Sequence, residues 1–217
     1  MSRGAGGGRS PGCSGVIAGG PERLVHPAPA TTAVLVCDVQ ERFRSVVPGY
    51  AGVVLAAAFM LRVRAELGLP LGLISEQYPK AFLHTAPDVL AAAAGGARVA
   101  EKTAFSMATA EALAALRAAG ARDVVLLGLE THICVLQTAL DLLAEGFAVH
   151  VCADGVASQR EGERAIALAR LAAAGAAVTS CESVAFQLLR DAAHPKFKAV
   201  SGLVKDYAAA RPGAAHL

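Results

Sequence analysis

Six short apolar runs constrain the fold of this chain more than any other feature of its sequence. They lie at residues 33–37, 69–74, 98–100, 123–127, 147–152 and 176–179, and most of them are apolar throughout instead of alternating with polar residues. Strands of this kind are typical of a parallel sheet that is buried on both faces. The sequence therefore predicts an α/β fold, a three-layer α/β/α sandwich around a six-stranded, mainly parallel sheet.

Segments with a helical apolar pattern fill the intervals between these runs. They lie at residues 50–67, 108–119, 133–144 and 159–174, with a further helix near 184–190 and a short one from Pro195. A glycine that can end a helix follows each of the first four, at Gly68, Gly120, Gly146 and Gly175. Ser158, with Glu161 three residues later, predicts a capping box at the start of the helix 159–174.

The 217 residues suffice for one domain with a sizeable core. Residues 1–30 are rich in Gly, Ser and Pro and predict a disordered tail, followed by one folded domain at 31–206 and a C-terminal tail at 207–217. We expect a cytoplasmic protein. Arg3, Arg9 and Arg23 leave a mitochondrial transit segment open, and the final tripeptide Ala215-His216-Leu217 is a relaxed form of a peroxisomal address.

Composition excludes several classes of function. A net charge of +2, no Trp and 5% aromatic residues give no surface suited to nucleic acid, and we expect no membrane partner because no apolar run reaches the roughly 18 residues of a span. The five cysteines form no CxxC pair, which favours a reducing compartment. We interpret Cys37, Cys152 and Cys181 as core thiols and place Cys13 in the tail.

Polar residues gather where the predicted strands end. Asp38 ends the first strand, Glu101 and Lys102 end the third, and Cys134 follows the fourth after a short turn. The second strand ends at Ser75-Glu76-Gln77, and the fifth leads to Asp154. Open α/β sheets bind ligands beyond the carboxyl ends of their strands, so we expect a carboxylate, an amine and a thiol on one rim.

Cys134 opens a helical pattern directly after a buried strand. The unpaired N–H groups and the dipole at a helix N-terminus stabilise a thiolate, and an ammonium at Lys102 would add to this effect. Asp38 can accept the thiol proton and return it to a leaving group. Taken singly, Asp38 can be a turn residue, Lys102 a surface charge and Cys134 a buried apolar residue; together they suit attack on an amide carbonyl.

Three segments at these positions resemble the isochorismatase-like cysteine hydrolases, which include nicotinamidases, carbamoylsarcosine amidases and isochorismatases. They read CDVQERF (37–43), EKTAFSM (101–107) and GLETHICV (128–135), and the resemblance covers residues 31–206. It implies a catalytic triad of Asp38, Lys102 and Cys134. It also implies a cis peptide between Leu129 and Glu130 that aims the Glu130 and Cys134 amides into an oxyanion hole.

The resemblance also places side chains in a substrate pocket and bears on metal binding. The pocket residues would be Gln40, Phe43, Glu76 and Tyr78, although Gln40 and Phe43 suit ordinary packing and hydrogen bonding equally well. Nicotinamidases hold a metal with an Asp-x-His-Pro segment and a second His, whereas residues 76–79 read EQYP here. We therefore predict no catalytic metal and no cofactor, and we interpret His84 as a surface histidine without assigning a role to His132 or His150.

The sequence thus predicts a cysteine-dependent hydrolase of a small amide or related carbonyl compound, acting through an acyl intermediate on Cys134. By resemblance we expect a homo-oligomer. Two alternatives stay open: a binding or regulatory module that keeps the fold without useful turnover, and a thiol redox protein that pairs Cys134 with another cysteine. Against the second, we expect Cys37 to point into the sheet core. The substrate itself is not specified by the sequence.

Overall fold

The computed structural model of this chain describes Met1 and residues 26–211. The predictions made for Cys13, for Arg3, Arg9 and Arg23, and for the tripeptide 215–217 lie outside these residues.

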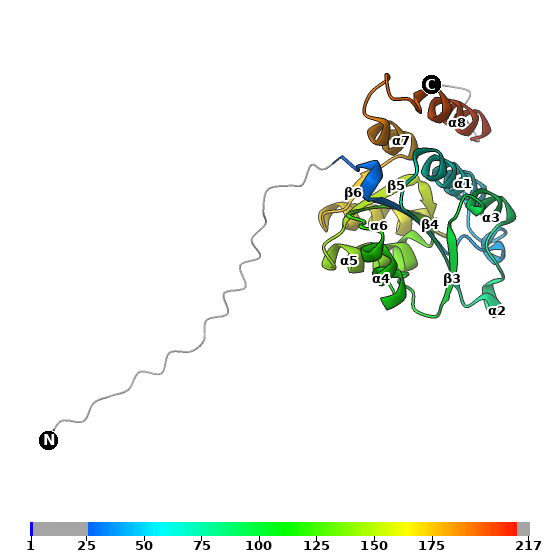
Figure 1. Ribbon diagram of the computed structural model, residues 1–217. Helices are drawn as coiled ribbons and strands as arrows, with labels where there is room; N and C mark the ends of the chain where they lie inside the picture. Colours follow the sequence, from blue (N-terminus) through cyan, green and yellow to red (C-terminus); the bar gives the residue numbers. More distant parts are fainter. Residues whose placement is uncertain (2–25, 212–217) are drawn as a thin grey trace.

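Six strands form a single sheet in which every neighbouring pair is parallel (Figure 1). The strands are β1 Thr32–Cys37, β2 Leu71–Gln77, β3 Arg98–Lys102, β4 Asp123–Leu129, β5 Ala148–Ala157 and β6 Ala177–Thr179, and their order across the sheet is β3-β2-β1-β4-β5-β6. The predicted parallel α/β fold is confirmed. Because the chain moves outward from β1 to β3 and then returns to the other side of β1 with β4, the order reverses between β1 and β4.

Helices cover both faces of the sheet. They are α1 Tyr50–Leu67, α2 Pro79–Phe82, α3 Pro87–Ala93, α4 Ala110–Ala118, α5 Leu136–Ala144, α6 Glu161–Ala173, α7 Cys181–Leu189 and α8 Phe197–Ala210. The buried side chains form two clusters, one between the sheet and α1, α3, α7 and α8, and one between the sheet and α4, α5 and α6. Each face of the sheet therefore has its own core. Among the described residues no helix is long and apolar enough to cross a membrane.

Two details differ from the sequence-based expectation. The helix α6 begins at Glu161 with Arg160 as its N-cap and no side-chain cap, because the Ser158 hydroxyl is engaged with His132 Nδ1 at 3.1 Å; the predicted capping box is wrong. The last helix continues to Ala210, past the expected boundary at residue 206. It does so because the buried Tyr207 ring stacks on Phe59 with centroids 4.5 Å apart.

The contact between β1 and β4 is unusually close at one point. Cys37 of β1 is in register with Gly128 of β4, whose φ is 151°. A Cβ atom on Gly128 would lie 2.2 Å from the Cys37 carbonyl oxygen, so only glycine fits. This approach brings the segments that follow both strands, at Asp38 and at Glu130, to the same edge of the sheet.

Candidate active site

Asp38 follows β1 directly and carries a buried carboxylate. Its backbone is in the left-handed region (φ 54°), a conformation that costs a non-glycine residue about 1 kcal/mol and turns the chain sharply after the strand. Oδ1 accepts a hydrogen bond from the Ser75 hydroxyl at 2.7 Å, and Oδ2 accepts one from Lys102 Nζ at 2.7 Å. Both carboxylate oxygens are thus held, one by a partner from β2 and the other by a partner from β3.

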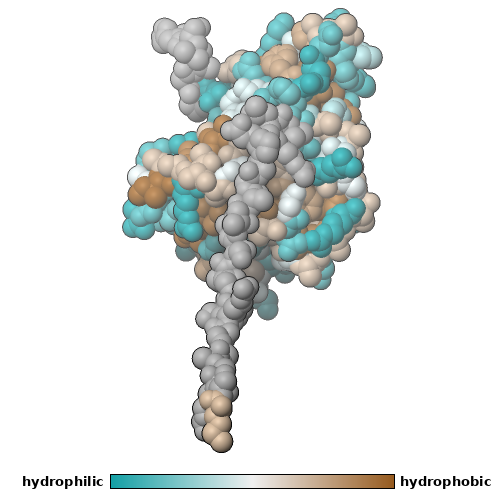
Figure 2. All heavy atoms as spheres, turned by 90° about the vertical axis from the view of Figure 1, so that its left-hand side faces the viewer, coloured by the Kyte–Doolittle hydropathy of each residue, from teal (hydrophilic) through white to brown (hydrophobic). Residues whose placement is uncertain are grey.

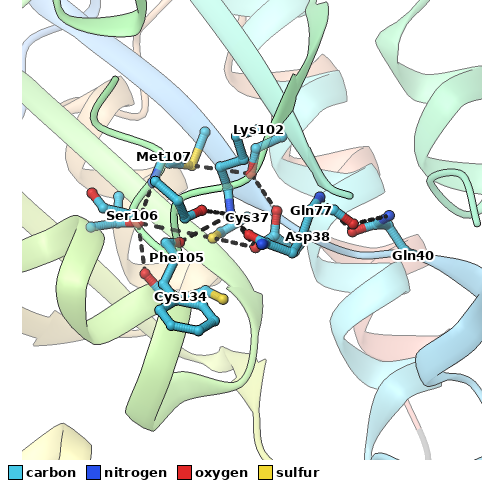
Figure 3. A network of polar contacts seen from close by, with 12 residues as sticks. Cys37, Asp38, Gln40, Gln77, Lys102, Phe105, Ser106, Met107 and Cys134 are labelled. Atoms are coloured by element: carbon cyan, nitrogen blue, oxygen red, sulfur yellow. Dashed lines mark hydrogen bonds and ion pairs between the residues drawn. The ribbon is translucent and has the colours of Figure 1, made fainter. Parts of the chain in front are cut away.

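Lys102 is the last residue of β3, and its side chain is only 2% exposed. Besides Asp38, its ammonium group reaches the Gln77 side-chain oxygen at 2.6 Å and the carbonyl oxygens of Ala104 and Phe105, each at 3.0 Å. A buried ammonium is tolerated when an opposite charge and further hydrogen bonds replace its water shell. The structure therefore brings Asp38 and Lys102 together as the sequence predicts, and it adds Ser75 and Gln77 as their supports (Figure 3).

Cys134 lies in a wide helical turn, Thr131–Val135, that leads into α5. The residue is 7% exposed and its carbonyl oxygen accepts a hydrogen bond from the Thr138 hydroxyl at 2.6 Å. The same Thr138 oxygen accepts a hydrogen bond from the Met107 N–H at 2.9 Å. Thr138 therefore ties the turn that carries Cys134 to the loop that follows β3 and Lys102.

The turn before Cys134 differs from what the resemblance implies. Every peptide bond within the described residues is trans, so the expected cis bond between Leu129 and Glu130 is wrong. Glu130 instead has a left-handed backbone (φ 53°, ψ 66°), which changes the chain direction without a cis bond. Its carboxylate lies 3.3 Å from His132 Nδ1 through Oε2, while Oε1 is buried without a hydrogen-bond partner.

Cys37 is the site residue that the sequence analysis missed. It is fully buried, as expected, but its thiol lies in the apolar cluster that also contains Cys134, and it donates to Asp38 Oδ2 at 3.5 Å. Interaction with the Cys134 side chain, burial and the Asp38 charge together raise the pKa of Cys37, while Lys102 opposes them. The alternation of side chains along β1 was the available signal, because it places residues 33, 35 and 37 on the α4–α6 face.

The four expected pocket residues take different positions. Gln40 is fully buried, and its amide group bonds the backbone of Gln77 and Leu83; Glu76 is buried and bonds His84 Nδ1 at 3.0 Å and Thr85 N at 2.7 Å. Both side chains hold loops together. Phe43 stacks on Phe82 with centroids 5.3 Å apart. Tyr78 alone of the four lines a cavity.

Two small cavities adjoin Lys102 at the β3 side of the site. One has a volume of about 360 Å³ and is lined by Tyr78, Glu101, Lys102 and neighbouring residues. The other, of about 180 Å³, is lined among others by Ser75, Lys102 and Met107. Lys102, whose ammonium group is itself buried, therefore lines space in which a small ligand can lie beside the ion pair.

The three histidines His84, His132 and His150 do not gather at one site. His84 has a side chain that is 74% exposed, in line with a surface histidine, yet it pairs with Glu76. His132 bonds Ser158, and His150 lies at the opposite end of the sheet with Nε2 3.1 Å from Asp123 Oδ1. Within the described residues, one group of metal-ligating side chains gathers, Cys152, Asp154 and Cys181, and its cysteines belong to the core on the other face of the sheet.

The family model and the curated relatives that match this chain carry the same family name. A family model described as Isochorismatase domain matches residues 32–183. Isochorismatase domain-containing protein 1 from Salmo salar is 44% identical over 178 residues, which cover 82% of this chain and 62% of the relative. Isochorismatase domain-containing protein 2A from Mus musculus is 39% identical over 178 residues, covering 82% and 84%. The chain thus spans less than two thirds of the Salmo salar relative.

Solved structures share the fold over most of both chains. The structure described as MAR1 ribonuclease from Caenorhabditis elegans superposes with a TM-score of 0.80 at 33% identity, covering 88% of this chain and 96% of that chain. YcaC from Pseudomonas aeruginosa, solved with hexane-2,5-diol and covalent acrylamide, gives a TM-score of 0.72 at 26% identity, covering 84% and 93%.

Proposed function

This chain belongs to the isochorismatase family, and on that premise we propose that it is a hydrolase whose Cys134 thiol attacks a small amide or a related carbonyl compound. The observation that carries the proposal is the buried ion pair between Lys102 and Asp38, 2.7 Å long, at the same sheet edge as the turn of Cys134. Asp38 is buried, both of its carboxylate oxygens accept hydrogen bonds, and the Cys37 thiol lies beside it. Such a carboxylate is suited to accepting and returning a proton.

The proposed reaction has two halves. Asp38 accepts the Cys134 proton while the sulfur attacks the carbonyl carbon, and backbone N–H groups of the turn that carries Cys134 stabilise the oxyanion. The C–N bond then breaks as Asp38 returns the proton to the leaving nitrogen, which leaves a thioester on Cys134. Water attacks this thioester, Asp38 accepts the water proton, and the acid product departs as the proton returns to the Cys134 sulfur.

Lys102 and its contacts would serve this reaction electrostatically. The ammonium group donates a hydrogen bond to Asp38 Oδ2 and so holds the carboxylate in one orientation. Ser75 and Gln77 keep both groups in place, because each bonds one member of the pair. None of these steps needs a cofactor.

A small substrate is favoured by the size of the space around Lys102. Typical small-molecule sites have volumes of roughly 300–1,000 Å³. The cavity of about 360 Å³ lies at the lower end of this range, and the cavity of about 180 Å³ lies below it. Support for a covalently reacting group at such a site comes from YcaC, which has been solved with covalent acrylamide.

The test is turnover of a panel of small amides, measured as released ammonia or amine, by the wild-type chain and by Cys134→Ala. We expect turnover in the wild type, its loss in Cys134→Ala, and its retention in Cys152→Ala, a matched change to a buried thiol on the other face. Saturable binding without turnover would instead support the binding module.

RNA belongs in the same assay because of the name of the Caenorhabditis elegans structure. This chain has a net charge of +2 and 5% aromatic residues, which does not favour binding to a phosphate backbone. We therefore expect no RNA cleavage. Cleavage of RNA that disappears in Cys134→Ala, without turnover of any amide, would overturn the proposed substrate class.

A homo-oligomer is also proposed for the whole chain. The face toward α5, α6 and β6 carries apolar atoms interspersed with polar ones (Figure 2), and Ile166 and Val178 are among the exposed apolar side chains, at 66% and 39%. Light scattering coupled to gel filtration should give a mass that is a multiple of the protomer mass. A single-protomer mass across the working concentration range would exclude the proposal.

A further inference from the structure

Cys37 and Cys134 form a pair of thiols inside the candidate active site. Cys37 ends β1, Cys134 follows the adjacent β4, and both side chains belong to the same buried cluster. Thr138 contacts both residues: its hydroxyl lies 3.9 Å from Cys37 Sγ and donates to the Cys134 carbonyl at 2.6 Å. Figure 3 shows the two cysteines in one group with Asp38 and Lys102.

We propose that Cys37 is a resolving thiol, which converts an oxidised Cys134 into a reversible Cys37–Cys134 disulfide and thereby makes the site a peroxide-sensitive modification site. The pairing itself rests on the adjacent strands, the shared buried cluster and the Thr138 contacts of both residues. Only its consequence, the loss of hydrolysis, rests on the proposed function of Cys134.

The two thiols have unequal environments, which sets the order of the reaction. Cys37 is completely buried and lies against the Asp38 carboxylate, so that it stays a neutral thiol with a raised pKa. Neutral thiols react slowly with peroxides, since the thiolate is the nucleophile. Cys134 is 7% exposed and is the proposed nucleophile, so oxidation begins there.

The chemistry balances with a hydroperoxide as the oxidant. The Cys134 thiolate attacks the peroxide, the O–O bond breaks, and Cys134 becomes a sulfenic acid while the peroxide is reduced to an alcohol or water. Cys37 gives its proton to Asp38, 3.5 Å away, and its sulfur attacks the Cys134 sulfur. The S–O bond breaks, the leaving hydroxide takes the proton from Asp38 as water, and a disulfide remains that a dithiol can reduce.

A second thiol pair provides an internal control. Cys152 and Cys181 lie on the opposite face of the sheet, with their sulfur atoms and an Asp154 oxygen all within 4.8 Å of one another. Both cysteines are fully buried, and burial is the main cause of a raised pKa at Cys181. We therefore expect this pair to remain reduced when the Cys37–Cys134 pair is oxidised.

The experiment treats the reduced full-length chain with hydrogen peroxide, blocks free thiols, and maps crosslinked peptides by mass spectrometry without reduction. We expect a Cys37–Cys134 crosslink that dithiothreitol reverses, together with recovery of any activity. In Cys37→Ser and Cys37→Ala the crosslink is lost and Cys134 proceeds to sulfinic acid, which dithiothreitol does not reverse. Cys152→Ser should behave as the wild type.

Three results would overturn the proposal. In the first, sulfinic acid forms on Cys134 equally fast with and without Cys37. In the second, the only crosslink joins Cys152 and Cys181, and in the third, Cys134 is not oxidised at all. Circular dichroism melting of each variant confirms that the chain is folded before oxidation. The crosslink is measured by mass, so this test does not depend on enzymatic activity. A wild-type chain that turns over no amide would contradict the proposed function, but the crosslink would still decide the present proposal.

Discussion

Lys102 Nζ lies 2.7 Å from Asp38 Oδ2, although the two residues are 64 positions apart and their strands, β3 and β1, are separated by β2. The ion pair therefore spans a strand. It can do so because Ser75 and Gln77 of that middle strand bond the carboxylate and the ammonium respectively. Four side chains from three strands form one buried polar unit, and this unit carries most of the testable consequences of the fold.

Removal of the Lys102 ammonium group should destabilise the fold. In Lys102→Ala the Asp38 charge stays buried without its partner, so we expect the free energy of unfolding in urea to fall by about 3–5 kcal/mol. Lys196→Ala, which removes an exposed partner of Glu66, should change it by less than about 1 kcal/mol. The double variant Asp38→Asn/Lys102→Met should recover part of the loss. Equal stability of Lys102→Ala and wild type would contradict the buried pair.

The hydroxyl of Thr138 should matter more than its shape. Thr138→Val leaves the Met107 N–H without its acceptor and the Cys134 carbonyl without its donor, so we expect a loss of about 1–3 kcal/mol in stability and a slower reaction at Cys134. Alkylation by iodoacetamide, followed by mass spectrometry, measures that reaction. Thr138→Ser keeps the hydroxyl and should stay close to wild type; identical effects of both changes would assign the role to packing.

Gly128 should tolerate no side chain. A Cβ there would meet the Cys37 carbonyl oxygen at 2.2 Å, so β1 and β4 would have to separate in Gly128→Ala, and we expect a loss of more than about 4 kcal/mol or failure to fold. Gly162→Ala is the matched control, because no atom lies within 4 Å of its added Cβ in helix α6. That change should stabilise the helix by about 0.5–1 kcal/mol. Thermal melting of both variants checks the contrast.

The Glu76–His84 pair predicts a specific pH dependence. The hydrogen bond that His84 donates to Glu76, and then the Glu76 charge, raise the pKa of His84 above 6.5. Burial alone would raise the pKa of Glu76, but the bonds from His84 and Thr85 outweigh it and lower this pKa below 4.5. The His84 contribution to stability is therefore complete below pH 6.5 and lost as the pH rises through the raised pKa; the Glu76 contribution is lost as the pH falls through the lowered pKa.

An NMR titration of the histidine ring signals checks this prediction. We expect the His84 signal to titrate above 6.5 in the wild type and to return toward 6.5 in Glu76→Gln. High salt should reduce the difference, because the imidazole is largely exposed. An unchanged His84 titration in Glu76→Gln would show that the pair does not form in solution.

The sheet and the meeting of Asp38 with Lys102 were predictable from the sequence, because both residues stand at the carboxyl ends of apolar runs. Helix α1 was also predicted to the residue, since Gly68 with φ 67° ends it. The capping box failed because His132, 26 residues from Ser158, competes for its hydroxyl. Such contacts between distant segments leave no local pattern, and the same reason hid the roles of Ser75, Gln77 and Thr138.

The orientation of Cys37 illustrates a different limit. Period-two alternation along β1 assigns Cys37 to one face, but only the position of α5 reveals that Cys134 lies on that same face. The contacts of two expected pocket residues were hidden for a related reason: Gln40 and Glu76 are polar residues near the rim, and their groups bond the backbone of neighbouring loops and His84.

The proposed mechanism requires a covalent bond between the substrate and the Cys134 thiol in the turn before α5. The decisive measurement is the intact mass of the chain, quenched in acid within milliseconds to seconds of mixing with a turned-over amide, followed by peptide mapping. We expect an added acyl group located on Cys134, which is absent from Cys134→Ala. Steady amide hydrolysis with no adduct on residue 134, and with full activity in Cys134→Ala, would contradict it.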